Sequence, residues 1–177
     1  MAFAKRLTQK SEQDLIAWTR LHKWSIENPG DFWKELSKFC SIKWSQNPDQ
    51  TYSLQSDDPM LGTSWFPGGE LNFAENLLLH LPENEAIISI QEGQSTRRFS
   101  RKKIIRDIKA LATAMGQSGI RPGDIIATTT INSYESVIIF LATASLGAIF
   151  SSCSPDFGKA GILDRFSQIN PKVLFYS

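Results

Sequence analysis

One stretch decides the fold of this chain: GDIIATTTINSYESVIIFLATASLGAIFSSCSPDFG, residues 123–158. Its opening, 125–130, is rich in β-branched residues and follows turn-forming residues, which predicts a buried strand. Asn132 is then placed to cap a helix, with a glutamate three positions later as in a capping box. Gly147 can end that helix in the left-handed conformation, and 148–152 re-enters the sheet. Because two strands joined through a helix pair in parallel, this stretch predicts a covered parallel sheet.

The segments around this stretch continue the alternation of strands and helices. Before it, 86–90 and 96–99 predict a short hairpin at the edge of the sheet, and Ser100 is placed to cap the next helix. After it, Asp156 is placed to cap a last helix, and 173–176 predicts another strand. This alternation is typical of an α/β fold with a doubly wound, mostly parallel sheet.

The beginning of the chain is helical and rich in aromatic residues. Residues 11–27 predict a helix with a wide aromatic face, and Asp31 is placed to cap a second helix that runs to residue 40. The apolar side chains of the second helix fall at helical spacing. Two helices alone bury little surface, so we expect this pair to dock on a larger body.

A connector and a third helix follow. Turn-forming residues punctuate 45–69 without sustained periodicity, which predicts an irregular connector. Because long ordered loops need anchors, we expect Trp65 and Phe66 to pack against other elements. Residues 71–81 then predict a helix, with Asn72 as its N-cap.

These patterns divide the chain into two domains. We expect 1–82 to be a helical amino-terminal segment and 83–177 to be the first, incomplete part of an α/β domain. The chain stops on an apolar strand, and an open parallel sheet that ended there would expose an apolar edge. We therefore expect the chain to be the front part of a longer protein.

Charge and composition narrow the class of protein. The net charge of +1 gives no field that would attract nucleic acid or an anionic membrane, and the basic cluster over 97–106 is typical of a solvated helix face. The amino terminus lacks the apolar core of a secretory signal, and no segment is long enough to span a bilayer, so we expect a cytoplasmic protein. Cys40 and Cys153 form no disulfide framework and no metal-ligand pattern with the two histidines. We assign no metal ligand.

The sequence contains no complete catalytic motif, so we assign no catalytic residue: there is no phosphate loop ending in Lys and Ser/Thr, no G-x-G-x-x-G and no nucleophile elbow. The candidate segment is SSCSPDFG, 151–158, which follows a predicted parallel strand at the edge where open α/β sheets bind ligands. The alternative is a turn whose serine and aspartate only cap the next helix. Cys153 could be a nucleophile or a small buried residue at a strand end.

Two blocks carry a resemblance to a known family: WFPGGELNFAENLL, 65–78, and SLGAIFSSCSPDFG, 145–158. With the Phe-Trp pair at 32–33 and the Arg-Pro-Gly-Asp turn at 121–124, nearly the whole chain resembles the amino-terminal part of the acetoacetyl-CoA synthetases, a branch of the adenylate-forming acyl-CoA synthetase family. Acetyl- and propionyl-CoA synthetases typically continue the first block with Cys-Leu-Asp-Arg-His, whereas this chain has Asn-Leu-Leu-Leu-His at 76–80. That difference favours the acetoacetate branch.

The resemblance implies a ligase that activates acetoacetate with ATP and Mg²⁺ as an acyl-adenylate, and then transfers the acyl group to CoA. In the related acetyl-CoA enzymes the segment after the matching strand approaches CoA, and those positions are Ser154, Pro155 and Asp156 here. The family's phosphate loop, metal carboxylates and mobile-domain lysine would lie beyond Ser177, so we expect this chain alone to be inactive. Two alternatives stay open: an enzyme for another short-chain acid, or a non-catalytic binding module that keeps this fold.

Overall fold

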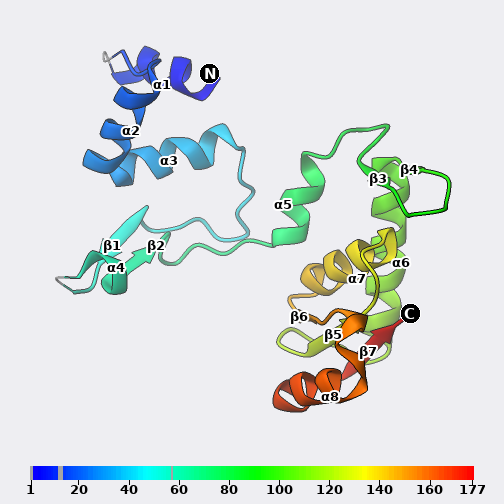
Figure 1. Cartoon of the computed structure of the whole chain (residues 1–177). Coiled ribbons are helices and arrows are strands. Elements are labelled where there is room, and N and C mark those ends of the chain that lie inside the picture. The colour runs from blue at the N-terminus through cyan, green and yellow to red at the C-terminus, as the bar shows by residue number, and fades with distance from the viewer. Residues whose placement is uncertain (1, 12–13, 57) are drawn as a thin grey trace. The chain divides into compact units, whose positions relative to one another are not determined.

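The computed structural model describes residues 2–11, 14–56 and 58–177, which fold as two compact units. One unit extends to Leu71, and the other begins at Asn72. Figure 1 labels the helices and strands of both units. The second unit contains the stretch that decides the fold.

A sheet of three parallel strands forms the centre of the second unit (Figure 1). Its order is β6-β5-β7, with β5 (Ile125–Thr129) between β6 (Ile149–Ser152) and β7 (Val173–Tyr176). Gly123 and Gly147 have φ of 85° and 67°, and Gly123 N donates to Gly147 O at 3.0 Å. These left-handed glycines bring the starts of β5 and β6 together. The predicted parallel sheet is confirmed.

The two crossover connections cover opposite faces of this sheet. Helix α7 (Tyr134–Ser145) joins β5 to β6, whereas a 3₁₀ turn, η1 (Pro155–Phe157), and α8 (Gly158–Ile169) lead from β6 past β5 to β7. Along β5, Ile126 packs among the apolar side chains of α7, and Ala127 packs against the apolar face of α8. Because successive side chains of a strand point to opposite faces, the two helices flank the sheet. The sheet is therefore doubly wound. The chain first adds β6 on one side of β5 and then β7 on the other side, so the order of strand addition reverses between β5 and β6.

The main hydrophobic core lies between α7, the sheet and the 17-residue helix α6 (Arg101–Gln117). Helix α6 contributes Ile104 and Ile108, four positions apart and at most 3% exposed, as the helical period predicts. Helix α7 contributes Leu141 and Ala142, at most 2% exposed. Burying a side chain of the size of leucine or isoleucine stabilises the fold by about 1.5–3 kcal/mol. The nearly continuous apolar run of α7 therefore reflects burial on more than one side.

The predicted hairpin is present but lies elsewhere than expected. β3 (Ile87–Ser89) and β4 (Arg97–Phe99) pair antiparallel and form a two-stranded sheet of their own. The expectation that they extend the edge of the parallel sheet is wrong. Phe99 is 4% exposed and stacks on the ring of Tyr134 at a centroid distance of 3.7 Å. Aromatic packing on α7 thus holds the hairpin. The pattern of a strand in the sequence does not show whether the strand will join the edge of a sheet or pack on a helix.

Two predicted N-caps are confirmed. Asn72 Oδ1 accepts a hydrogen bond from Glu75 N at 3.0 Å at the start of α5 (Phe73–Leu79). Ser100 Oγ accepts one from the backbone N–H three residues later, at 3.4 Å, at the start of α6. Asn72 also donates through Nδ2 to Ala144 O at 3.0 Å. One side chain therefore caps α5 and ties it to the end of α7.

Two other predicted caps are wrong. Helix α7 is capped by Ser133, whose Oγ accepts from the N–H three residues later at 3.4 Å, and not by Asn132. Asp156 does not cap α8, because the cap position is Phe157 and its side chain makes no capping hydrogen bond. Instead, Ser154 Oγ accepts from Asp156 N at 3.3 Å and caps η1. The proline that begins η1 favours this short turn before the helix, since its fixed φ suits a first helical position.

The first unit contains a helix that the sequence patterns did not predict. α1 (Ala2–Ser11) precedes α2 (Trp18–Glu27). The helix expected over 11–27 is therefore confirmed over 18–27 and wrong over 14–17, and its positions 12 and 13 lie outside the described residues. Leu15 is 2% exposed, and its N donates to Thr8 Oγ1 at 3.0 Å. This bond connects the segment before α2 back to α1.

The next helix, α3 (Pro29–Phe39), begins earlier than expected. Asn28 stands at its N-cap, so the prediction that Asp31 is the cap is wrong. Proline suits the first helical position because its missing N–H would have no partner there. Asp31 lies in the first turn, where a carboxylate still favours the helix dipole.

The predicted connector contains regular structure, so the expectation of an irregular segment throughout is wrong. β1 (Tyr52–Leu54) and β2 (Thr63–Trp65) pair antiparallel, with the one-turn helix α4 (Pro59–Gly62) between them. Three-residue strands are too short for a periodicity to emerge from the sequence.

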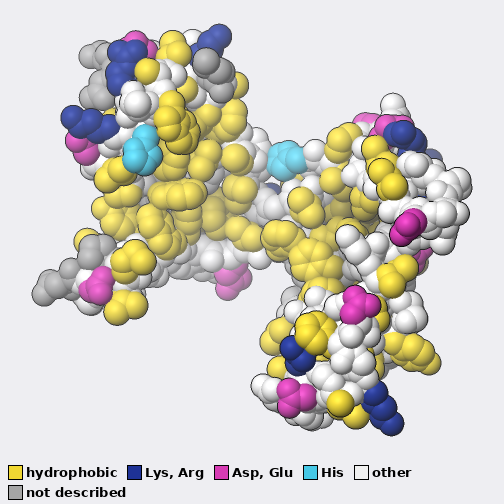
Figure 2. All heavy atoms as spheres, in the orientation of Figure 1, with side chains coloured by type: hydrophobic (Ala, Val, Ile, Leu, Met, Phe, Trp, Pro, Cys, Tyr) yellow, Lys and Arg dark blue, Asp and Glu magenta, His cyan; other side chains and the backbone are white. Residues whose placement is uncertain are grey.

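The aromatic anchors of this connector are confirmed. Trp65 packs edge-on against Trp33 of α3 at 5.7 Å between ring centroids, and Phe66 lies 5.2 Å from Trp44. Figure 2 shows hydrophobic side chains over much of the visible face of this unit.

Candidate functional site

A crevice of about 540 Å³ opens at the carboxyl ends of β5 and β6, where the order of strand addition reverses. Ligands of doubly wound sheets bind at this reversal. All three predicted site residues, Ser154, Pro155 and Asp156, line it. The geometry therefore brings together the residues that the sequence singled out.

The first wall of the crevice is a chain of hydroxyl groups. Thr128 Oγ1 and Thr130 Oγ1 lie 2.9 Å apart, and Thr130 Oγ1 lies 2.7 Å from Ser136 Oγ. Ser136 Oγ donates to Ile131 O at 2.6 Å. Since each hydroxyl has one proton, this last bond orients the whole chain: Thr130 donates to Ser136, and Thr128 donates to Thr130. The unused lone pairs make this wall an acceptor of hydrogen bonds.

The sequence patterns did not single out this wall. Thr128 and Thr130 share one face of the strand because side chains alternate, and Ser136 stands in the first turn of α7. Two threonines on one face at the end of a buried strand could have indicated a polar wall at this edge of the sheet. However, threonine is also common in strands because it is β-branched, so these two residues alone do not indicate a site.

The second wall is the turn after β6. Ser154 Oγ lies 3.0 Å from Asp156 Oδ2 and accepts from Asp156 N at 3.3 Å, so the turn is held by its own side chains. Pro155 between them has a fixed φ. The sequence left open whether Ser154 only caps a turn or lines a ligand site. In the structure it caps η1, and the same turn lines the crevice.

Cys153 lies at the base of this turn. It is 7% exposed, packs with Ala127 and Phe166, and its Sγ is 3.6 Å from Ser154 O. This packing favours the interpretation as a small buried residue over that of a nucleophile.

The electrostatic character of the crevice follows from its lining. Asp156 is the one charged residue among the residues that line it, and all of these belong to the described part of the chain. Val137, Phe140 and Phe150 add apolar surface. A carboxylate, hydroxyl acceptors and no lysine, arginine or histidine suit a neutral ligand segment with N–H or O–H donors; a phosphate would find no counter-charge there.

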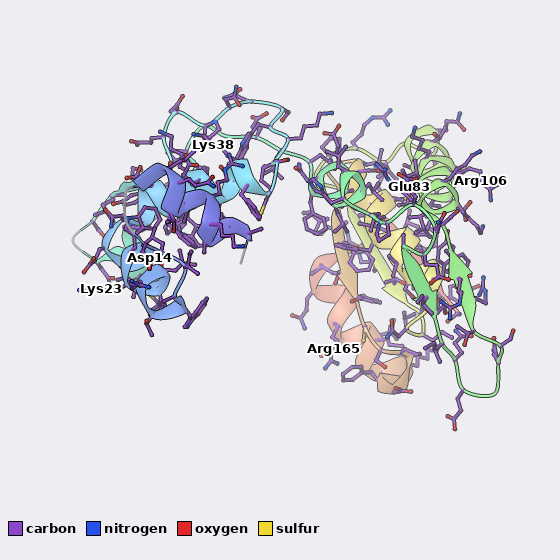
Figure 3. All side chains as sticks on the ribbon, turned by 90° about the horizontal axis from the view of Figure 1, so that it is seen from above. Asp14, Lys23, Lys38, Glu83, Arg106 and Arg165 are labelled. Carbon is purple, nitrogen blue, oxygen red and sulfur yellow. The ribbon has the colours of Figure 1, made fainter. Side chains whose placement is uncertain are left out.

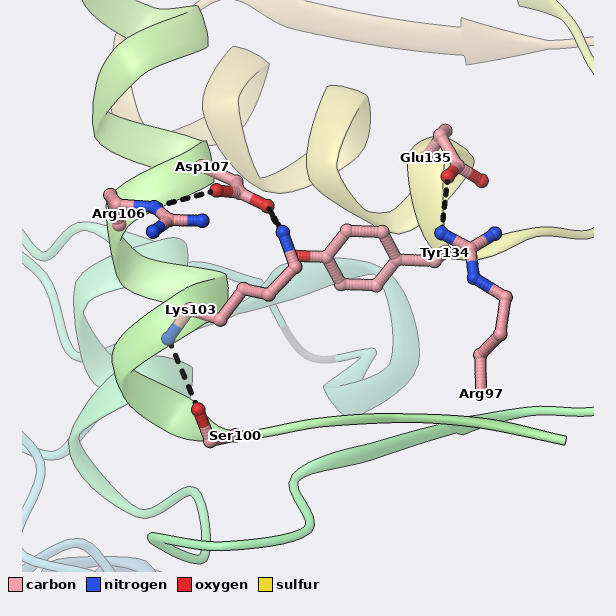
Figure 4. A network of polar contacts seen from close by, with 7 residues as sticks. All are labelled: Arg97, Ser100, Lys103, Arg106, Asp107, Tyr134 and Glu135. Atoms are coloured by element: carbon pink, nitrogen blue, oxygen red, sulfur yellow. Dashed lines mark hydrogen bonds and ion pairs between the residues drawn. The ribbon is translucent and has the colours of Figure 1, made fainter.

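A polar network holds the start of α7 against α6 (Figure 4). Asp107 of α6 accepts from Lys103 Nζ at 2.7 Å and from Tyr134 OH at 2.9 Å. The hydrogen bond from Lys103, and then that from Tyr134, lower the pKa of Asp107 to about 2. Burial, and then the Asp107 carboxylate, raise the pKa of Tyr134. The phenol therefore stays a neutral donor, and we call the set of Lys103, Asp107 and Tyr134 the α6–α7 brace.

Ion pairs neutralise much of the predicted basic face. The pairs are Arg97–Glu135 at 3.2 Å, Arg98–Glu85 at 2.8 Å and Arg101–Glu83 at 2.6 Å. In each pair the glutamate is more than half exposed, so each pair contributes about 0–1 kcal/mol. The pairing agrees with a solvated face and leaves little net charge for an anionic partner.

The first unit has a larger hollow of about 910 Å³ beside α3. Lys34 and Lys38 line it together with Asp31 and Asp49, so its charges balance. None of the predicted site residues lies there. The crevice of the second unit is therefore the better candidate site.

Among residues 2–11, 14–56 and 58–177, no three His, Cys, Asp or Glu side chains form a group that could hold a metal ion. In the same part of the chain, no helix has the length and apolar character needed to cross a bilayer.

Comparisons with known proteins agree with this geometry. Residues 18–77 match the family described as acetyl-coenzyme A synthetase N-terminus, and residues 77–177 match the family described as AMP-binding enzyme. The α/β fold class is confirmed. The predicted domain boundary between residues 82 and 83 stays a prediction.

Relatives and a solved structure give the same family. The chain is 40% identical over 161 residues to acetoacetyl-CoA synthetase of Macaca fascicularis, which covers 88% of this chain and 23% of the relative. It is 39% identical over 152 residues to acetoacetyl-coenzyme A synthetase of Rhizobium meliloti (strain 1021), which covers 86% and 23%. Acetoacetyl-CoA synthetase from Streptomyces lividans matches 99% of this chain and 27% of that chain, with a TM-score of 0.89 and 29% identity. The predicted resemblance is confirmed, and the chain spans about a quarter of the length of these relatives.

Proposed function

Because the chain belongs to the family of AMP-binding enzymes, we propose that it is the amino-terminal part of an acid–thiol ligase for acetoacetate. In the proposed reaction, the acetoacetate carboxylate attacks the α-phosphate of ATP, which gives an acyl-adenylate and releases pyrophosphate. The CoA thiol then attacks the activated carbonyl, and AMP leaves as acetoacetyl-CoA forms.

One observation carries this proposal. The likeness to acetoacetyl-CoA synthetases runs through both compact units and is not confined to the α/β unit. Many enzymes share an α/β fold without sharing a substrate, so the sheet alone would not support the choice of acid.

In this proposal, Ser154, Pro155 and Asp156 form one wall of the CoA site, and the hydroxyl chain of Thr128, Thr130 and Ser136 forms the other. Both walls accept hydrogen bonds. The part of CoA that enters the crevice is then a neutral one whose N–H and O–H groups can donate, and its phosphates stay outside. The chain's contribution is to position the thiol carrier, which lowers the barrier by orientation.

ATP and Mg²⁺ belong to the proposal for the whole enzyme. The crevice offers no cation to a triphosphate, and the described residues provide no group of ligands that fits Mg²⁺. No step of the adenylation is therefore assigned to a residue of this chain. We also propose a cytoplasmic location and small-molecule partners, acetoacetate, ATP and CoA, which the net charge of +1 supports over nucleic acid or a membrane.

The test measures acetoacetate-dependent exchange of labelled pyrophosphate into ATP. We expect the full-length protein to catalyse exchange and the isolated 177-residue chain to give none. Faster exchange with another short acid would overturn the choice of acetoacetate. No exchange with any short acid would favour a non-catalytic binding module.

A further inference from the structure

The hydrogen bonds of Ser136 fix the direction of the hydroxyl chain in the crevice. Its Oγ lies 2.6 Å from Ile131 O, and a carbonyl oxygen has no proton, so Ser136 must donate there. With its one proton used, Ser136 Oγ accepts at its two other contacts, Thr130 Oγ1 at 2.7 Å and Ser133 Oγ at 3.4 Å. Both lone pairs of Ser136 are then occupied. Ser136 itself therefore offers nothing to a ligand, but it determines what the threonines offer.

The two threonines keep acceptor groups for a ligand. Thr130 Oγ1 donates to Ser136 and accepts from Thr128 at 2.9 Å, which leaves it one lone pair. Thr128 Oγ1 has given its proton to Thr130, so it can only accept. Thr128 is 2% exposed and lines the crevice. Because hydrogen bonds are stronger away from water, a donor that enters the crevice gains more from these oxygens than it would at an exposed surface.

The surroundings of the threonines determine which kind of donor fits. Three apolar side chains also line the crevice: Val137, Phe140 and Phe150. Figure 3 labels three charged residues of this unit, Glu83, Arg106 and Arg165, and none of them lines the crevice. Asn132, two residues after Thr130, does line it, and its Nδ2 can donate to a carbonyl oxygen. A secondary amide within an aliphatic chain matches this lining, because it combines apolar carbons, an N–H group and a carbonyl oxygen.

We propose that Thr128 and Thr130 accept a hydrogen bond from an amide N–H of the pantetheine arm of CoA, and that Ser136 is the positioning residue that makes them acceptors. This inference rests on the proposed function, because it concerns the same CoA site. The pantetheine arm carries two secondary amides in an aliphatic chain. Without the Ser136 hydroxyl, the proton of Thr130 is free to turn towards the ligand, and the preference for an N–H group is lost.

The experiment compares CoA with two analogues in the full-length enzyme, each with one amide of the pantetheine arm replaced by an ester. The ester keeps the carbonyl and removes the N–H. In the unsubstituted enzyme, we expect KM for one of the two esters to be about fivefold above KM for CoA, as loss of one neutral hydrogen bond causes, with little change in kcat. In Ser136→Ala, the two KM values should become equal, because Thr130 can then donate to the ester oxygen. Ser136→Thr keeps a hydroxyl at this position and should restore the preference for CoA.

The matched control is Ser133→Ala, which removes a hydroxyl from the start of the same helix but not from the lining of the crevice. It should lower stability through loss of the α7 cap and leave the preference for CoA over the ester unchanged. A loss of preference in Ser133→Ala would overturn the inference, because the effect would then come from the start of α7 as a whole.

Two further results would overturn the inference while the ligase activity itself stands. One is equal KM values for CoA and both esters in the unsubstituted enzyme. The other is a Ser136→Ala enzyme that keeps the full preference for CoA. Absence of ligase activity in the unsubstituted enzyme would instead contradict the proposed function.

Discussion

The crevice and the α6–α7 brace are both polar and share α7, but they are built in opposite ways. In the brace, the Asp107 carboxylate already accepts from Lys103 and Tyr134, so its charges are paired. In the crevice, the hydroxyl chain and Asp156 leave acceptor groups towards an open space with no cation. The charged side chains of the brace are therefore satisfied by one another, whereas the hydroxyl groups of threonine and serine line an open crevice.

The largest expected effect is on the core that carries the brace. Ile104 of α6 is fully buried in the main hydrophobic core, so Ile104→Ala removes buried surface and leaves a cavity. We expect a loss of about 3 kcal/mol in the free energy of unfolding, measured by urea denaturation. KM for CoA of the enzyme that remains folded should be unchanged.

The control for this substitution is Lys109→Ala, an exposed position on the same helix. It should change stability by less than about 0.5 kcal/mol. An Ile104→Ala protein as stable as the control would contradict the burial of α6.

A smaller effect is expected from the brace itself. Tyr134→Phe keeps the ring stack on Phe99 and removes the hydroxyl that donates to Asp107. We expect a loss of about 1–2 kcal/mol in unfolding free energy, because the bond is to a charged acceptor and the aspartate keeps its lysine. Thermal unfolding measures the loss. A change in KM for CoA without a loss of stability would assign Tyr134 to the site and break the comparison.

The brace also predicts a pH dependence. Its hydrogen bonds lower the pKa of Asp107 from 3.8 to about 2, so the folded state binds this proton less readily than the unfolded chain. The stability that Asp107 contributes is therefore fully present above about pH 4 and is lost as the pH falls towards 2. Urea denaturation at a series of pH values should show this loss, and Asp107→Asn should lack it. Equal slopes in both proteins would contradict the role of the brace.

Much of the second unit could be predicted from the sequence because its signals are local. The β-branched run before Asn132, the apolar helix and Gly147 together indicate a strand, a helix and a second strand. The cap was misplaced by one residue because Asn132 and Ser133 are both good caps, and only the register of α7 chooses between them. The packing of the hairpin on Tyr134 depends on a tertiary contact between distant residues, and the periodicity of a short segment does not predict such a contact.

The lining of the crevice, which is the candidate site, could be predicted in part for the same reason. Ser154–Asp156 follows a recognisable strand, and the ends of parallel strands meet at one edge. The opposite wall arises only when the first turn of α7 brings Ser136 next to Thr130, which is a contact between two elements.

The most direct test of the central claim separates the two half-reactions in a full-length enzyme with Asp156→Ala. If the turn of Ser154–Asp156 forms a wall of the CoA site, acetoacetate-dependent pyrophosphate exchange should be unchanged, while KM for CoA in AMP release rises about tenfold. Asp156→Asn should retain part of the affinity, and Asp164→Ala on the exposed side of α8 should have no effect. Loss of pyrophosphate exchange in Asp156→Ala, or a KM for CoA equal to that of the unsubstituted enzyme, would contradict the account.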